Sequence, residues 1–142
     1  MKVGNMVSIT DVDQQKLVEK AAEELKKSMK QPEWSRFVKT GMSRERPPEQ
    51  KDWWFLRAAS ILRNVSLNGP IGTSRLRSYY GGRQRQGHQP PRFAKSSGKI
   101  IRVLLKELEE KGFVKKTDKP RKGRIVTSQG QKLLSAAAKH AK

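Results

Sequence analysis

The chain has 142 residues, a formal net charge of +19 and a mean hydropathy of −0.84, so nucleic acid or an anionic membrane is the expected partner. Its apolar runs are far shorter than the ~18 residues of a membrane span, and residues 1–6 lack the apolar core of a signal peptide. Without cysteine, a disulfide framework or a thiolate zinc site is excluded, and the cytoplasm is the expected location.

The N-terminal third is expected to be helical. Apolar side chains recur at three- and four-residue spacing over residues 10–30, which predicts an amphipathic helix. Pro32 suits the first position of a second, short helix. The apolar residues that follow it are expected to pack in the core: Trp34, Phe37 and Val38. Two adjacent prolines then keep residues 43–51 extended as a polar linker.

A central helix is predicted from Asp52, which can cap it, to Asn68. Its strong apolar stripe comprises Trp54, Ala58, Ile61, Leu62 and Val65. A tight glycine-containing turn leads from this helix into a short one that ends near Tyr79. A third helix is predicted over residues 96–111, so the three helices have the order of a helix-turn-helix unit.

Two short strands are predicted after the third helix, at residues 113–114 and 124–127. The turn between them is basic, and a final helix starts at Ser128. The predicted fold is therefore mainly α, with a winged-helix-like three-helix core, a small β-hairpin wing and extra N- and C-terminal helices. We expect one domain over residues 1–142, with an N-terminal helical extension and linker (1–51) and the helix-turn-helix core, basic loop, wing and C-terminal helix (52–142).

The most unusual stretch is Tyr79–Phe93, which contains three glycines, two prolines, three arginines and no acid. Its glycines and prolines exclude a long helix or a central strand, so a loop is predicted. The stretch lies inside a longer window, residues 53–106, that has 11 Lys or Arg and no Asp or Glu. A surface of this kind favours a polyanionic partner, and RNA is the preferred one.

Catalysis and metal binding are not expected. The chain has only two histidines, and no carboxylate lies near His88 in the sequence to share a metal with it. The acid-free centre also argues against acid–base catalysis. We therefore predict no enzyme activity, no catalytic residue, no cofactor, no metal and no small-molecule substrate.

RNA binding accounts for the remaining features. Arginine contacts phosphate through a rigid bidentate fork and stacks on exposed bases. Tyr79, Tyr80 and Phe93 are candidate stacking platforms, and glycines let the backbone approach a phosphate closely. The candidate RNA-binding residues are Trp53, Arg57, Arg63, Arg75, Arg77, Tyr80, Gly81, Gly82, Arg83, Arg85, Arg92, Lys95, Lys99 and Arg102.

Several short motifs, in order along nearly the whole chain, are together highly specific. They are Pro32-Glu33-Trp34, Lys39-Thr40-Gly41, Asp52-Trp53-Trp54, Arg57-Ala58-Ala59-Ser60, Tyr80-Gly81-Gly82-Arg83, and Gly123-Arg124 with Thr127. In these motifs the chain resembles the archaeal and eukaryotic S19e family of small-subunit ribosomal proteins.

The resemblance implies a winged-helix-like protein that binds ribosomal RNA in the head of the small subunit and is needed for late assembly and maturation of the precursor RNA. It also implies that neighbouring ribosomal proteins of the head are partners. By match to the family's basic surface, it implicates Trp53, Arg57, Arg63, Gly81, Gly82, Arg83, Arg85 and Arg102. We expect no membrane partner and a monomer when the protein is free.

A winged-helix DNA-binding transcription regulator is the alternative, because Leu108, Gly112, Val114, Arg124 and Thr127 also fit that hairpin pattern. Such a regulator normally reads the major groove with the helix before the wing. Here that helix ends in Glu107, Glu109 and Glu110, and the basic residues are densest ahead of it. The pattern therefore favours RNA.

Overall fold

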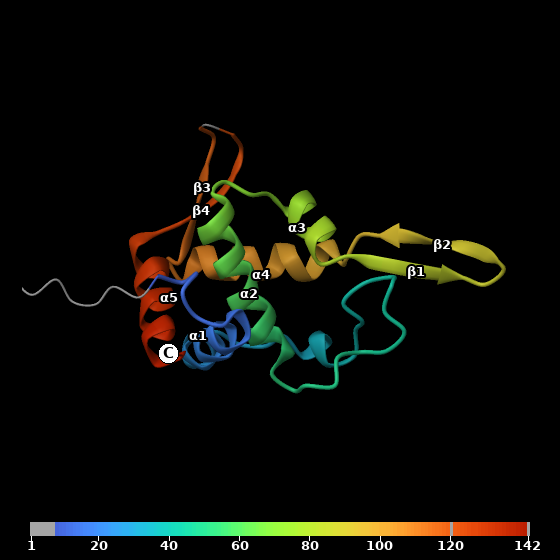
Figure 1. Cartoon of the computed structure of the whole chain (residues 1–142), viewed down its shortest axis with the longest axis horizontal. Coiled ribbons are helices and arrows are strands. Elements are labelled where there is room, and N and C mark those ends of the chain that lie inside the picture. Colours follow the sequence, from blue (N-terminus) through green and yellow to red (C-terminus); the bar gives the residue numbers. More distant parts are fainter. Residues whose placement is uncertain (1–7, 120, 142) are drawn as a thin grey trace, which may run out of the picture.

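A computed structural model describes residues 8–119 and 121–141 of the chain (Figure 1). Residues 1–6, predicted to lack a signal-peptide core, lie outside this part, as does Pro120 of the predicted wing turn. The elements are α1 (Gln14–Ser28), the 3-10 helix η1 (Glu33–Arg36), α2 (Trp53–Asn68), α3 (Thr73–Tyr79), β1 (Gly82–Gln86), β2 (Gln89–Ala94), α4 (Gly98–Glu110), β3 (Val114–Thr117), β4 (Gly123–Val126) and α5 (Ser128–Ala141). In the described ranges, every helix is too short or too polar to cross a bilayer.

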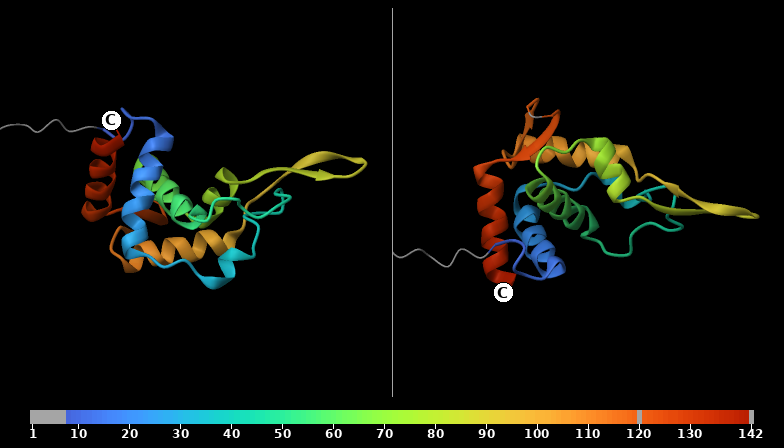
Figure 2. Two further views of the ribbon diagram at one scale, coloured as in Figure 1. Left: turned by 90° about the horizontal axis from the view of Figure 1, so that it is seen from below. Right: turned by 45° about the horizontal axis from the view of Figure 1, so that its top comes forward.

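One hydrophobic core joins the helices. Helix α2 lies at its centre and packs against α1, α4 and α5, while α1 also packs against α5 (Figures 1 and 2). Trp54 on α2 is fully buried, and the rings of Trp53 and Trp34 meet it edge-on at centroid distances of 5.6 and 5.5 Å. Leu17 and Leu25 of α1 belong to the same buried cluster. The apolar stripe expected on α2 is confirmed, and α1 completes the core around it.

The helix-turn-helix order and the wing are confirmed. Strands β3 and β4 pair antiparallel with Val114 opposite Val126, and Ile71, in the turn between α2 and α3, forms an isolated bridge to Arg124 of β4. A Cβ added at Gly123 would lie 2.7 Å from the backbone nitrogen of Ile71. Glycine at this position therefore lets the wing lie against the turn of the helix-turn-helix unit.

The prediction of a loop over residues 79–93 is wrong, because most of this stretch forms an antiparallel hairpin. Strands β1 and β2 pair with Gly82 opposite Ala94 and Gln84 opposite Arg92, and the register shifts between Gln84 and Gln86. A proline is excluded from a central strand, but both strands of a two-stranded ribbon are edges. Pro90 and Pro91 fall where the register shifts, so neither removes a regular ladder hydrogen bond.

The hairpin of β1 and β2 projects from one end of the helical body, and α5 lies at the opposite end (Figures 1 and 2). Its turn contains Gly87, whose φ is +72°, a conformation that glycine adopts without steric cost. The hairpin therefore carries its arginines away from the core.

The expected core position of Phe37 is also wrong. Its side chain is 81% exposed, whereas Trp34 and Val38 are half-buried and pack against the core. Phe37 directly follows η1, at the C-cap position where the chain turns away from the helices. Helical spacing could not place it, because only a single 3-10 turn forms here.

The burial of Trp54 predicts a large loss of stability on truncation. Trp54→Ala should lower the free energy of unfolding by ~3–5 kcal/mol, because it removes a fully buried indole and leaves a cavity. Denaturant unfolding followed by circular dichroism measures this change. Phe37→Ala, at an exposed aromatic, is the control and should change stability by less than ~0.5 kcal/mol. Equal effects of the two variants would contradict the packing described here.

A tight contact at Gly130, in the first turn of α5, predicts a second destabilising variant. An added methyl group would meet the carbonyl oxygen of Phe113 and lie 2.5 Å from Cγ2 of Val126. Gly130→Ala should therefore lower the free energy of unfolding by ~1–3 kcal/mol, although alanine favours helices. The matched control is Gly72→Ala, since nothing lies within 4 Å of its added methyl group and its φ is −105°. A stabilised Gly130→Ala protein would show that α5 can shift away from the wing.

Candidate nucleic-acid interface

Arg57 of α2 and Tyr80, which follows α3, lie in direct contact within the candidate interface. The guanidinium carbon of Arg57 lies 4.1 Å from the centroid of the Tyr80 ring. The Tyr80 hydroxyl forms a 2.6 Å hydrogen bond with the Ser60 hydroxyl. A cation over an aromatic face gains ~0.5–2 kcal/mol, depending on its desolvation. The contact therefore holds Arg57 in one orientation and joins two residues that the sequence analysis proposed separately.

Burial changes the proton affinity of both groups in this contact. Desolvation by burial lowers the pKa of Arg57; a charge on the Tyr80 phenol opposes this shift, and the nearby charge of Arg44 adds to it. Burial raises the pKa of Tyr80, although its hydrogen bond with Ser60 opposes the shift. Near neutral pH, Arg57 stays charged and Tyr80 stays neutral. A half-buried arginine of this kind can donate to a phosphate from a fixed position.

A pocket of about 430 Å³ adjoins this contact and contains two arginines that the sequence analysis missed. Arg44 and Arg46 come from the linker before α2 and line the pocket together with Arg57. No residue that lines it is acidic. The sequence analysis interpreted residues 43–51 only as a polar linker that two adjacent prolines keep extended. Only the folded chain brings Arg44 and Arg46 beside Arg57.

Arg77 and Arg102 meet at the start of α4. The Nε atom of Arg77 donates to the carbonyl oxygen of Ser96 at 3.0 Å. A methyl group at Gly98 would lie 2.7 Å from a terminal nitrogen of Arg102 and 3.2 Å from Cδ of Arg77. Glycine at this position therefore leaves the space that both arginine side chains occupy. Helix α3 and the first turn of α4 together form one cationic region.

The β1–β2 hairpin carries its arginines on both faces. Arg83 is exposed and lies opposite Phe93, while Gln84 lies opposite Arg92, so the two pairs occupy opposite faces of the ribbon. Phe93 is 59% exposed and available for stacking. At the base of the hairpin, a methyl group on Gly81 would lie 2.5 Å from the carbonyl oxygen of Ala94. This close approach explains why glycine occupies the position directly before β1.

The other predicted residues lie apart from these groups. Arg63 is ~120° around α2 and ~9 Å along its axis from Arg57, and its Nε is buried without a hydrogen-bond partner in the described part of the chain. Arg75 is exposed on α3, on a different side from Arg77. Trp53 is only 8% exposed, so little of its surface is available to RNA. The structure thus gives Trp53 mainly a packing role beside Arg57.

Two of the predicted lysines lie near the base of the hairpin. Lys99, in the first turn of α4, has its ammonium nitrogen 4.8 Å from the centroid of the Trp34 ring. Lys95 follows β2 and is exposed. Both therefore extend the cationic region that Arg77 and Arg102 begin.

The cations of residues 53–106 form none of the ion pairs recorded in the described ranges. These pairs join Lys20 to Glu23, Lys26 to Asp52, Lys27 to Glu24, and Arg124 to Glu109. Each of these cations lies outside the acid-free window. The arginines of the interface are therefore not neutralised by carboxylates of α1.

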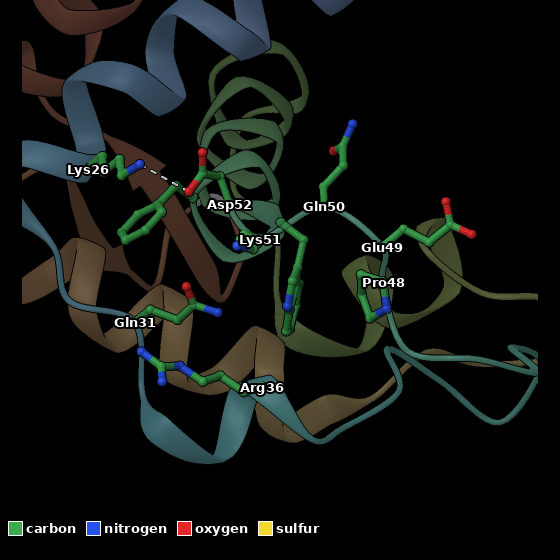
Figure 3. Close-up of a pocket in the computed structure, with 10 residues that line it drawn as sticks. Lys26, Gln31, Arg36, Pro48, Glu49, Gln50, Lys51 and Asp52 are labelled. Atoms are coloured by element: carbon green, nitrogen blue, oxygen red, sulfur yellow. Dashed lines mark hydrogen bonds and ion pairs between the residues drawn. The ribbon is translucent and has the colours of Figure 1, made fainter.

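A neighbouring pocket of about 530 Å³ has mixed charge and is a less suitable polyanion site (Figure 3). Asp52 and Glu49 line it, and Asp52 accepts a 3.1 Å hydrogen bond from Lys26. Asp52 occupies the N-cap position of α2 but forms no capping bond with its side chain, so the predicted capping is replaced by this ion pair. Across residues 8–119 and 121–141, no cluster of three or more His, Cys, Asp or Glu is placed to hold a metal ion.

Comparison with known proteins gives a consistent result. The sequence profile of the family described as "Ribosomal protein S19e" matches residues 8–142. Proteins named "Small ribosomal subunit protein eS19" are similar over most of their length: that of Thermoplasma acidophilum is 43% identical, with 94% of this chain and 89% of that protein covered. That of Haloarcula marismortui is 42% identical (94% and 90% covered), and that of the eukaryote Mya arenaria is 44% identical (93% and 89% covered).

These matches confirm the resemblance found in the sequence motifs, and they span archaeal and eukaryotic relatives. The family consists of structural ribosomal proteins and not of enzymes. The match of this chain to the family confirms the expected cytoplasmic, ribosomal location. The structure agrees with this match: the chain has a mainly helical fold with a winged-helix core, and an arginine-bearing hairpin projects from it. The chain belongs to the ribosomal protein S19e family of the small ribosomal subunit.

Proposed function

We propose that this small-subunit ribosomal protein binds ribosomal RNA directly through the cationic face that runs from α2 to the β1–β2 hairpin and the start of α4. It acts as one RNA-binding domain in the subunit head, next to other head proteins, and is monomeric when free. It also binds the precursor RNA and is needed for late assembly and maturation of the subunit. The RNA-binding residues are Arg57, Arg63, Arg75, Arg77, Tyr80, Gly81, Gly82, Arg83, Arg85, Arg92, Lys95, Lys99 and Arg102, with Trp53 supporting Arg57.

The single observation that carries this proposal is that, within residues 8–119 and 121–141, these cations form no ion pair with an acidic side chain. Residues 53–106 contain 11 Lys or Arg and no acid, and the recorded ion pairs of the described ranges all use cations outside this window. Uncompensated like charge destabilises a compact protein through self-repulsion. Phosphates of folded RNA remove that repulsion on binding, and the release of their counterions favours the complex.

The geometry suits RNA phosphates and unstacked bases together. Arg57 is held over Tyr80, so it loses little side-chain freedom when it contacts a phosphate. Arg83 and Arg85 are exposed on a ribbon that projects from the body, where they reach a groove or backbone at a distance. Phe93, on the same ribbon face as Arg83, supplies an exposed ring for stacking.

The alternative, a winged-helix DNA-binding regulator, has less support. In such a regulator α4 would enter the major groove, but the last turn of α4 is acidic and its side chains form contacts within the protein. Glu107 accepts a 3.0 Å hydrogen bond from the backbone nitrogen of Lys30, and Glu109 pairs with Arg124 at 3.6 Å. The family match also favours the ribosomal function over DNA binding.

Charge reversal on the hairpin tests the proposal. The double variant Arg83→Glu/Arg85→Glu should fail to enter small subunits, because it places two carboxylates where phosphates are expected, while its thermal melt stays close to that of the unmodified protein. Sucrose-gradient sedimentation of lysates that express tagged variants measures incorporation.

The matched control is Lys132→Glu/Lys139→Glu, which makes the same change in charge at exposed positions of α5, at the opposite end of the molecule. This control should still sediment with small subunits. An equal loss of incorporation for both variants would show that net charge alone decides incorporation. Normal incorporation of the hairpin variant would refute the proposed interface.

Salt dependence provides a second test with purified protein and small-subunit RNA. If ~6–10 phosphates are neutralised, affinity should fall ~10³- to 10⁵-fold between 50 and 200 mM salt. Filter binding at several salt concentrations gives the slope directly. Weak binding at the lowest salt, or an affinity that salt leaves unchanged, would contradict binding through phosphates.

A further inference from the structure

A groove of about 850 Å³ separates residues 37–42 from the base of the β1–β2 hairpin. This volume lies within the ~300–1,000 Å³ of sites that enclose small organic ligands. The residues that line it come from four segments brought together by folding: Phe37, Val38, Lys39, Gly41, Met42, Arg77, Gln84, Gln86, Arg92, Phe93, Ala94, Lys95, Ser96 and Ser97.

Backbone contacts fix the walls of this groove. Gly41 forms an isolated bridge to Ser96, and the backbone nitrogen of Ser97 donates to the carbonyl oxygen of Thr40 at 2.8 Å. A methyl group at Gly41 would lie 3.1 Å from Cα of Ser96, so the two segments are as close as their backbones allow. On the other wall, the backbone nitrogen of Ser96 donates to the carbonyl oxygen of Arg77 at 3.0 Å. The groove is therefore preorganised and not a gap between mobile loops.

The charge of the groove is of one sign. Four cations line it and no lining residue is acidic; the cations are Lys39, Arg77, Arg92 and Lys95. They lie along both walls, so a phosphodiester chain that enters the groove has cationic partners on either side.

The groove also contains groups that a phosphate does not use. Phe37 is 81% exposed and Met42 is 64% exposed, although apolar side chains of this size normally avoid water when they can be buried. The amides of Gln84 and Gln86 each offer donors and an acceptor. An apolar platform and two amides are groups that bind the face and the edge of a nucleobase.

We propose that this groove binds an unstacked nucleotide of a single-stranded RNA segment, with its base on Phe37 and its phosphates on Arg77, Arg92 and Lys95. Gln84 and Gln86 then contact the edge of the base. The inference rests on the proposed function, because it assumes that RNA is the ligand of the cationic face. It adds a base-binding subsite that includes three residues outside the predicted interface: Phe37, Gln84 and Gln86.

Single-stranded RNA fits these observations better than duplex RNA or an acidic peptide. In a duplex the base faces are covered by stacking, so Phe37 and Met42 would gain no partner. An acidic peptide could also pair with the cations and cover the apolar groups. Its backbone would form hydrogen bonds with the amides of Gln84 and Gln86 whatever the peptide sequence. The net charge of +19 and the acid-free window around the groove favour the more highly charged polyanion.

The test compares binding of the full-length protein to two probes of one sequence: a short single-stranded RNA that carries a fluorescent, stacking-sensitive adenine analogue, and its fully paired duplex. Phe37→Ala should weaken binding to the single strand about 5- to 150-fold, as expected for the loss of one aromatic–base stack. It should leave duplex binding unchanged, and the quenching of the analogue should disappear. Phe37→Tyr, which keeps the ring, should restore both.

The matched control is Leu67→Ala, which removes an apolar side chain of α2 that is 40% exposed and does not line the groove, so single-strand affinity should stay intact. Salt dependence separates stacking from charge. Phe37→Ala should keep the slope of log affinity against log salt, whereas Arg92→Gln should reduce its magnitude by ~0.7, the value for one lost phosphate contact to a single strand.

Two results would overturn the inference while the proposed function stands: wild-type single-strand affinity in Phe37→Ala, or equal losses of affinity in Phe37→Ala and Leu67→Ala. A Phe37→Ala protein that binds RNA normally but dissociates from assembled subunits would also overturn it, because the occupant would then be a protein segment. If the unmodified protein binds neither probe nor small-subunit RNA at low salt, the proposed function itself fails.

Discussion

The arrangement of the whole cationic face depends on the backbone junction at Ser96 and Ser97. Three segments meet there: the segment after η1 through Thr40, the last turn of α3 through Arg77, and the start of α4. Each contact uses backbone donors and acceptors, which must be paired when they are removed from water. The hairpin, whose strands make few contacts with the helices, is fixed to the body by this junction. Its direction therefore follows from hydrogen bonds at its base and not from packing along its length.

The separation of charge along the chain has a structural counterpart. Acidic residues of α1 pair with lysines of the same helix, Asp52 pairs with Lys26 of α1, and Glu109 of α4 pairs with Arg124 of the wing. Among the residues that the structure describes, the arginines of α2, α3 and the hairpin have no such partners. In this arrangement the apolar core stabilises the fold, and the cationic side chains are available to bind a polyanion. In the S19e family that polyanion is, by our proposal, ribosomal RNA.

The β1–β2 hairpin presents two chemically different faces because a strand alternates its side chains. One face carries Arg83 and Phe93, and the other carries Gln84 and Arg92 above the groove. A disordered loop with the same residues would lose more conformational entropy on binding and would not separate these groups. The ribbon thus converts a glycine- and proline-rich segment into a preorganised surface.

The sequence by itself determined the order of the helices, the wing and the cationic character of the centre. Helical periodicity and the charge of a segment can be read from residues that are close together in the chain. It also carried the family motifs from Pro32 to Thr127. Only the tertiary structure decided that residues 82–94 pair as a ribbon, because two prolines are excluded from central strands but not from edges. It also decided that Phe37 is exposed and that Arg44 and Arg46 join Arg57. These outcomes depend on contacts between segments far apart in the chain, which no local pattern records.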